Sequence, residues 1–289
     1  MMILAMIRRA MRRALQWRLL LLSPVVLLVA ALATLLPLIR VLGEMLDHST
    51  RWRELTGLDS YAAAGMVKAM SAPAASAIAT GVQASFVLGF LLAPLLAGAA
   101  LVVADADARP RLRELLSGAA GYYPRLLRMQ FAALIPLAAA GLLGMLVMRW
   151  ADHVDDAATS EASTHLSTRL AWFLAIALLL VAQIVVDAGR ARLAAEPERR
   201  SAVKALGAGV KLLIKRPAEV LALGVSSTVI ALLIAAILLV VRQQIAQSSG
   251  AAVMLAFLLG QCAVVAIAWG HAVKLCGLVE IARDVNRTR

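Results

Sequence analysis

Long, mostly apolar windows with hardly any charge alternate with short charged segments along the whole chain. A helix needs about 20 such residues to cross about 30 Å of hydrocarbon, and these continuous runs lack the alternation of membrane barrel strands. The pattern predicts an all-α polytopic membrane protein, with a single transmembrane domain over residues 1–289. The six predicted spans cover residues 19–39, 82–104, 129–148, 170–189, 220–241 and 251–273.

The composition indicates that nearly the whole chain belongs to this membrane domain. Hydrophobic residues make up 62% of the sequence and charged residues 16%. Soluble domains are roughly 45–50% apolar and about 25% charged. An ordinary soluble fold is therefore excluded.

The positive charges gather on one side of the predicted arrangement. The formal net charge is +12, and most of the 29 Lys and Arg residues lie before the first span, in the second and fourth gaps, or after the last span. By the positive-inside rule these segments stay in the cytoplasm, so we expect a multi-pass membrane protein with both termini cytoplasmic. The net positive charge is explained by the orientation of the protein in the membrane and by attraction to anionic lipid headgroups. That attraction contributes about 1 kcal/mol for each basic residue near the surface. We expect no nucleic-acid partner, because no recognition module accompanies the charge.

A basic amphipathic stretch precedes each odd-numbered span, starting near residues 3, 109 and 197. Apolar residues recur at helical spacing among Arg and Lys in each stretch. We predict three cytoplasmic elbow helices that lie in the membrane interface before the chain turns into the membrane. The unit of elbow, span and span then occurs three times, although the copies share little sequence. The predicted apolar faces are Leu4, Ile7, Met11 and Leu15; Leu112, Leu115, Leu116, Ala119 and Leu126; and Val203, Leu206, Val210 and Leu213.

The basic residues of the second and third elbow stretches are candidates for contact with anionic headgroups or with a cytoplasmic or membrane protein partner. Three lysines of the third stretch share one helical stripe. The candidates are Arg111, Arg113, Arg125, Arg128, Arg199, Arg200, Lys204, Lys211 and Lys215.

Two outer loops separate the predicted spans on the opposite side. The first covers residues 41–81 and is long enough to hold an amphipathic helix that begins at Tyr61, with Ser60 as its N-cap. The second, residues 150–168, is acidic and polar, which is typical of a solvated loop.

Polar residues lie inside or near the ends of several spans. Asp187, near the cytoplasmic end of the fourth span, needs a partner because an unpaired acid is costly there, and Arg190 follows one turn later. This pair fits either a local ion pair or a functional hinge or coupling site. His271 and Lys274 stand three residues apart on the last span, and the histidine fits a packing role, a proton relay or contact with a lipid phosphate. The remaining intramembrane candidates are Gln183 and Gln261, which could hydrogen-bond across helix interfaces.

Motifs for several classes of enzyme are missing from the sequence. There is no Walker lysine motif, nucleophile elbow, HExxH or CxxC. We therefore expect no cofactor, no metal site and no enzymatic activity.

Two strings carry a family resemblance: LLSGAAGYYPRLLRM at 115–129 and VVDAGRARLAAEPERRSAVKALGAGVKLLIKRP at 185–217. They resemble a broad group of uncharacterised bacterial six-helix inner-membrane proteins, which are similar in turn to the membrane domain fused to some glycerophosphodiester phosphodiesterases. The resemblance implies the six-helix fold and no particular activity. The chain departs from the group's pattern at Ala188, where the group has an aromatic residue, and at Gly189, where it has alanine. The matching positions are Asp187, Arg190, Glu198, Arg200, Ser201, Ala202, Arg216 and Pro217.

Three functions are compatible with these patterns. The first is a non-enzymatic subunit of a membrane transport assembly, which docks a partner or anionic headgroups through its elbows. A weaker likeness to compact six-helix permeases driven by a separate ATPase agrees with this, although their long outer segment after the fifth span is absent here. The second is a standalone carrier for a lipid or small hydrophobic molecule. The third is an intramembrane lipid-modifying enzyme that uses His271 and Asp187, which requires them to lie within about 10 Å.

Overall fold

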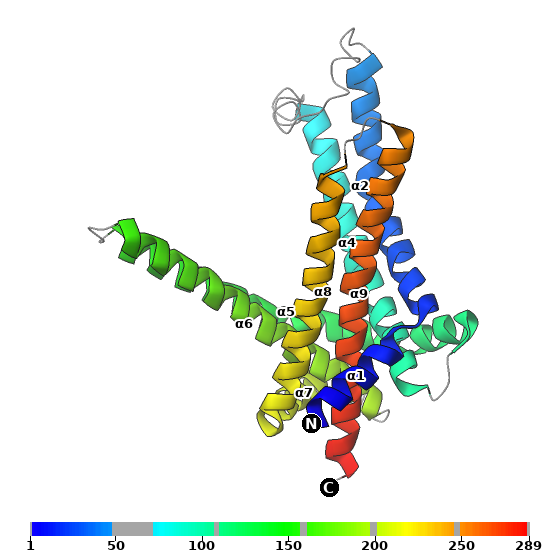
Figure 1. The fold of residues 1–289 in the computed structure, drawn as a ribbon, viewed down its shortest axis with the longest axis vertical. Helices are drawn as coiled ribbons and strands as arrows, with labels where there is room; N and C mark the ends of the chain where they lie inside the picture. Colours follow the sequence, from blue (N-terminus) through cyan, green and yellow to red (C-terminus); the bar gives the residue numbers. More distant parts are fainter. Residues whose placement is uncertain are drawn as a thin grey trace. The chain divides into compact units, whose positions relative to one another are not determined.

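A computed structural model describes residues 2–47, 72–106, 110–156, 161–196, 201–245 and 249–287. Every regular element within these ranges is an α-helix (Figure 1). The helices are α1 (Met2–Ala14), α2 (Trp17–Asp47), α4 (Ala72–Asp105), α5 (Leu112–Asp156), α6 (Glu161–Ala195), α7 (Ala202–Lys215), α8 (Pro217–Gln243) and α9 (Gly250–Arg287).

Six of the described helices are long and apolar enough to cross a membrane. Each predicted window lies inside one of them, so the prediction of six spans is confirmed in terms of length and composition. The candidate spans are Trp17–Val41, Ala75–Asp105, Leu112–Val154, Ser167–Ala195, Pro217–Gln243 and Gly250–Arg287.

In the smaller of two compact units, Pro24–Ala93, the described residues are a pair of antiparallel helix segments from α2 and α4. The Ser85 hydroxyl donates to the Ala30 carbonyl at 2.7 Å, and the Thr34 hydroxyl donates to the Gly81 carbonyl at 3.1 Å. A Cβ on Gly81 would lie 2.8 Å from a backbone oxygen of α2, so glycine permits this close approach. Such contacts associate membrane helices, because lipid tails supply no hydrophobic driving force between them.

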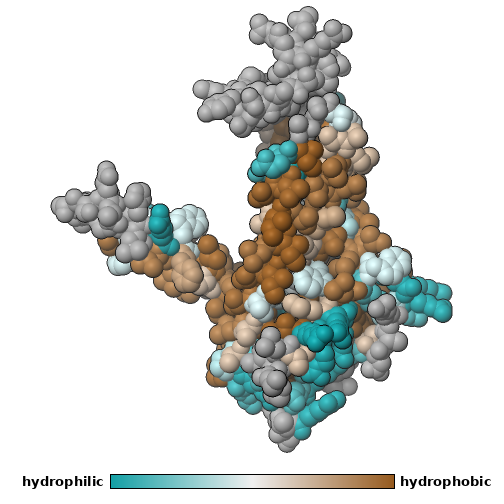
Figure 2. Space-filling model, in the orientation of Figure 1, coloured by the Kyte–Doolittle hydropathy of each residue, from teal (hydrophilic) through white to brown (hydrophobic). Residues whose placement is uncertain are grey.

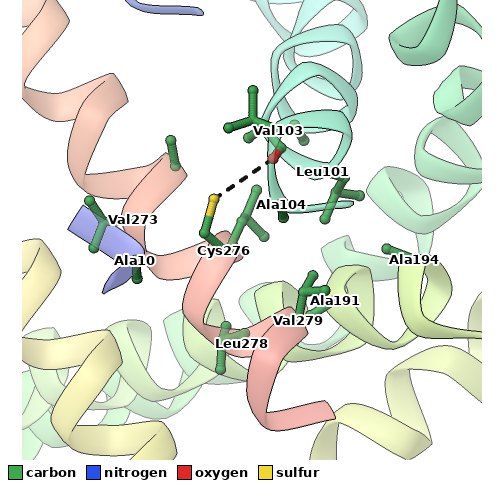
Figure 3. Close-up of a cluster of buried hydrophobic side chains, with 14 of the residues drawn as sticks. Ala10, Leu101, Val103, Ala104, Ala191, Ala194, Val273, Cys276, Leu278 and Val279 are labelled. Carbon is green, nitrogen blue, oxygen red and sulfur yellow. Dashed lines mark hydrogen bonds between the residues drawn. The ribbon is translucent and has the colours of Figure 1, made fainter. Parts of the chain in front are cut away.

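The larger unit, Met1–Ser23 with Pro94–Arg289, has its core where the basic segments meet. Residues 184–194 of α6 and 272–279 of α9 are buried without interruption. Buried residues of α1, the last turns of α4, and α5, α7 and α8 belong to the same core. Figure 3 shows Cys276 of α9 pointing toward the end of α4, where its Sγ lies 3.9 Å from the Ala100 carbonyl oxygen. Many core residues are alanines, which lets the helix backbones come close together.

Beyond this core the helices expose large apolar side chains. Ile135 of α5 is 71% exposed and Phe173 of α6 is 73% exposed. Figure 2 shows apolar surface along the helices and hydrophilic side chains gathered around α1, α7 and the end of α9. This distribution agrees with contact to hydrocarbon along the helices and to water or headgroups at the basic end.

The first and third elbow stretches form separate helices, α1 and α7, whereas the second does not. It is the first part of α5, which continues through Pro124 into the third span. A proline is tolerated inside a membrane helix because neighbouring groups satisfy the freed backbone atoms. In the first stretch the helix α1 ends at Ala14 and α2 begins at Trp17. Between them, the buried Gln16 side chain donates a hydrogen bond of 2.9 Å to the carbonyl of Pro110, just before α5.

On α7 and α1 the residues buried inside the protein are not those of the predicted apolar faces. On α7 the buried residues are Ala205, Gly209 and Leu212, whereas Val203 and Val210 of the predicted interfacial face are exposed. Ala205 and Gly209 lie at the contact with α6, where a larger side chain does not fit. A Cβ on Gly209 would lie 2.6 Å from the carbonyl oxygen of Val185.

The first stretch shows the same difference, and the second shows it only in part. On α1 the buried stripe is Met6, Ala10 and Ala14, and the predicted Leu15 is 61% exposed. Ile7 and Met11 are partly buried beside that stripe, and the side chain of Leu4 lies outside the described residues. In the second stretch Leu115, Ala119 and Leu126 of the predicted apolar face are buried, and Leu112 and Leu116 are exposed.

The connections between spans are shorter than predicted. The described helix α2 continues to Asp47 and α4 begins at Ala72, and the predicted amphipathic helix from Tyr61 lies outside the described residues. Most of the predicted 150–168 loop is helical, because α5 continues to Asp156 and α6 begins at Glu161. A charge-free window marks the hydrocarbon core and not the helix ends, since polar residues can extend a helix into the interface.

Candidate functional site

A buried polar cluster connects α6 to α9. Asp187 is fully buried, and its Oδ1 accepts a hydrogen bond of 2.9 Å from Arg190 Nη1, one turn along α6. Its Oδ2 lies 2.6 Å from the ammonium nitrogen of Lys274 on α9. That contact is an ion pair whose angle departs from hydrogen-bond geometry. The Asp187–Arg190 pair predicted from sequence is therefore present, and Lys274 joins it from another helix.

Two further residues complete this cluster. Arg190 Nη2 donates to Gln130 Oε1 on α5, so the cluster spans three helices. His271 Nδ1 lies 3.8 Å from Asp187 Oδ2, and the His271 side chain is 30% exposed, unlike the other α9 member, Lys274. The sequence pattern does not single out Gln130. Gln130 is a polar residue at the start of an otherwise apolar span, and that is the signal that could have found it.

The charges of this cluster hold α6 against α9. One carboxylate lies against two cationic side chains, one near each of its oxygens. Buried ion pairs are held by mutual attraction and are costly to break on one side. The separation of His271 and Asp187 meets the distance condition of the enzyme hypothesis. Both Asp187 oxygens face cations, and the contact with Lys274 joins α6 to α9.

A second polar cluster lies one turn further along α6. Arg192 is buried, and its Nη1 donates to Asn286 Oδ1 at 2.6 Å and to the Ala282 carbonyl at 3.3 Å, both on α9. The same nitrogen lies 3.2 Å from Glu196 Oε1. In the sequence Arg192 counts only as one of many positive charges. Its partners on α9 lie 90 and 94 positions away in the sequence, so a local sequence pattern cannot predict them.

A basic cleft lies between α7 and the end of α6, and we call it the α7 cleft. Its volume is about 380 Å³, and it brings together the three lysines that the sequence places on one stripe. All three lysines are exposed. The lining residues are Arg192, Glu196, Lys204, Gly207, Ala208, Lys211 and Lys215.

A second cleft, the α1 cleft, has a volume of about 390 Å³ and lies between α1, the start of α8 and the end of α9. Arg9 pairs with Glu280 at 3.0 Å, which joins α1 to α9. Arg216 lies 3.2 Å from Glu219 and 2.7 Å from Asp284. The hydrogen bonds to Glu219 and then to Asp284 raise the pKa of Arg216 above its usual value, so it stays protonated.

The other candidates lie outside these clusters. Gln183 and Gln261 are half-buried on α6 and α9, and Arg125 is half-buried on α5. Arg113 and Arg128 of α5 are exposed, and so is Arg111, which directly precedes this helix. Arg199 and Arg200 lie outside the described residues. The structure therefore brings together Asp187, Arg190, His271 and Lys274 at one site and the three α7 lysines at another.

Comparison with known proteins identifies no relative of this chain. The chain matches no protein-family model, no curated protein and no solved structure.

Proposed function

We propose that this protein is a non-enzymatic, multi-pass subunit of a transport assembly in the bacterial inner membrane. Both termini lie in the cytoplasm, and the basic end of the larger unit docks anionic groups. The fold is that of the bacterial six-helix inner-membrane group that the 185–217 string resembles. The anionic groups are lipid headgroups or an acidic segment of a partner.

The observation that carries this proposal is the outer surface of α7. Lys204, Lys211 and Lys215 are exposed on one side of the helix and line one cleft. The small face of the helix is packed against α6, so the lysines are presented on a fixed element. Basic clusters at the cytoplasmic ends of membrane helices attract anionic lipid surfaces.

The packing of α1 supports the proposed topology. α1 packs against the C-terminal part of α9, and Arg9 pairs with Glu280 there. Figure 1 draws both ends of the chain beside this contact. Two termini at the same end of one unit agree with an even number of spans, and the surrounding arginines favour the cytoplasmic side.

Lipid binding is tested by the thermal stability of the purified full chain in neutral detergent. A ligand that binds the folded state raises Tm in proportion to RT ln(1 + [L]/Kd). We expect added phosphatidylglycerol to raise Tm more than phosphatidylcholine does. Replacing Lys204, Lys211 and Lys215 by Gln should remove most of that difference.

The matched control neutralises three exposed arginines at the opposite helix ends, Arg149, Arg169 and Arg242, to Gln. This variant should keep the full response to phosphatidylglycerol. Equal responses to the two lipids in the wild-type protein would overturn headgroup docking. For partner docking, the same three lysines replaced by Glu should release a polypeptide that copurifies with the wild-type protein, and unchanged copurification would contradict it.

The carrier alternative has less support from the described residues. It requires a polar cavity near the middle of the membrane, whereas the α1 and α7 clefts both lie at the basic end. The enzyme alternative meets its distance condition, because His271 and Asp187 are 3.8 Å apart. An Asp187→Asn variant that keeps its fold but loses a lipid-modifying activity of the wild type would favour that alternative.

A further inference from the structure

The α7 helix presents two exposed stripes in the same register. Val203, Val210 and Ile214 are 69%, 42% and 72% exposed. Each of them directly precedes one of the three lysines. Neighbouring residues are about 100° apart around a helix with 3.6 residues per turn. An apolar stripe therefore runs beside the basic stripe for the whole length of α7.

This pairing fits a lipid better than a soluble anion or an acidic peptide. An interfacial helix buries its apolar side at the acyl-chain boundary while its lysines reach the headgroups. A soluble anion would use only the lysines. An acidic peptide would leave the branched apolar stripe in contact with water, which is unfavourable.

The charge of the cleft extends over more than one phosphate group. Four cationic side chains and one carboxylate line it. With a rise of 1.5 Å per residue, Lys204 and Lys215 are about 16 Å apart along the helix axis, whereas Lys211 and Lys215 are about 6 Å apart. Arg192 lies on the α6 side of the cleft. A single phosphate reaches one part of this row, and two phosphates joined by a short linker reach more of it.

The cleft has the size and the rigidity of a binding site. Its volume of about 380 Å³ falls in the range of roughly 300–1,000 Å³ typical of small-molecule sites. Arg192 is held by Asn286 and the Ala282 carbonyl, so its position is fixed before a ligand arrives. The Ser201 hydroxyl accepts from the Lys204 backbone N–H and caps the first turn of α7. A preorganised site loses less free energy to ordering when it binds.

We propose that the α7 cleft is a binding site for a lipid that carries two phosphate groups, such as cardiolipin. The phosphates lie along Lys204, Lys211 and Lys215, and the acyl chains cover Val203, Val210 and Ile214. This inference rests on the proposed docking of anionic headgroups and names the lipid class that the α7 cleft selects.

The test compares cardiolipin with phosphatidylglycerol at equal total phosphate, using native mass spectrometry and Tm of the full chain in detergent. We expect cardiolipin to bind at least tenfold more tightly per phosphate. The Lys204→Gln, Lys211→Gln and Lys215→Gln triple variant should lose this preference. The Arg149→Gln, Arg169→Gln and Arg242→Gln control should keep it, and circular dichroism verifies that both variants are folded.

A second variant separates a lipid from a soluble diphosphate. Val203→Ser, Val210→Ser and Ile214→Ser together should weaken cardiolipin binding several-fold and leave binding of its deacylated headgroup unchanged. Equal affinity for cardiolipin and phosphatidylglycerol would overturn this inference while headgroup docking stands. No preference for either lipid over phosphatidylcholine would overturn both. Displacement of cardiolipin by a poly-glutamate peptide at equal charge would assign the cleft to a protein partner instead.

Discussion

Replacing Asp187 by Asn should destabilise the protein strongly, because it removes the only carboxylate in contact with Lys274 and Arg190 among the described residues. Asn keeps the size of the side chain and loses its charge. Lys274 and Arg190 are then left buried beside a neutral amide, without a carboxylate to balance their charges. The change isolates the electrostatic contribution of the cluster from its packing.

The distances give the magnitude. At an effective dielectric constant of about 20, contacts of 2.6 Å and 2.9 Å each correspond to about 6 kcal/mol of attraction. Repulsion between the two cations and the desolvation of all three groups offset much of this. Breaking one side of a buried pair typically costs about 3–5 kcal/mol, and we expect a loss of that size.

A second substitution sharpens the test. Lys274→Met removes the cation that Asp187→Asn strands, so the double variant should be more stable than Asp187→Asn alone by about 1–3 kcal/mol, as coupled neighbours are. Asp152→Asn on α5 is the matched control, because Asp152 is exposed and such changes are usually within about 0.5 kcal/mol.

The assay is unfolding of the purified protein in mixed micelles of increasing sodium dodecyl sulfate content, followed by tryptophan fluorescence. If Asp187→Asn lowers the free energy of unfolding no more than the Asp152→Asn control does, the buried ion pairs do not stabilise the packing of α6 on α9. A double variant less stable than Asp187→Asn would show that Lys274 acts through packing and would refute the charge argument.

Three further predictions follow from the packing and the topology. Gly209→Val should destabilise the protein by more than about 3 kcal/mol, because the added Cβ would meet the α6 backbone. Gly207→Ala should instead stabilise it by about 0.5–1 kcal/mol, because a Cβ at that position has open space around it. The same unfolding titration measures both changes. In a Cys262→Ser background, Cys276 should resist a membrane-permeant maleimide until detergent unfolds the protein, since it is 2% exposed; rapid labelling of the folded chain, read by intact mass, would contradict the described core. Single cysteines added at the two ends of this variant should both react with an impermeant maleimide only after the inner membrane is opened, and labelling of one end alone in intact cells would refute the proposed topology.

The membrane spans could be predicted from sequence because crossing the hydrocarbon requires a long run of uncharged residues, which can be read directly along the chain. A window without charges must be long enough to cross, and each predicted window lies inside a described helix. The Asp187–Arg190 pair could also be predicted, since both residues lie on one helix at a spacing of three.

The partners across helices could not be predicted in this way. Lys274 reaches Asp187, and Asn286 reaches Arg192, only because α6 packs on α9. That packing depends on the shapes of whole helices, which a local pattern does not contain. Hydrophobic periodicity likewise identified Val203 and Val210 as part of the apolar face of this helix, but it did not indicate that the close contact with α6 buries Ala205 and Gly209 instead. In a membrane protein a large apolar side chain is as stable against lipid as against protein, so periodicity alone does not tell the two apart.

The crossing of α7 over α6 limits how the third elbow can vary. A scan of all substitutions along α7 should show intolerance to added volume at Ala205, Gly209 and Leu212, with one minimum per helical turn. Residue size should matter far less at the valines and lysines between them. The positions of α7 that tolerate substitution least would then differ from its most hydrophobic positions. A sequence alignment scored on hydrophobicity would therefore give most weight to positions that matter little for packing.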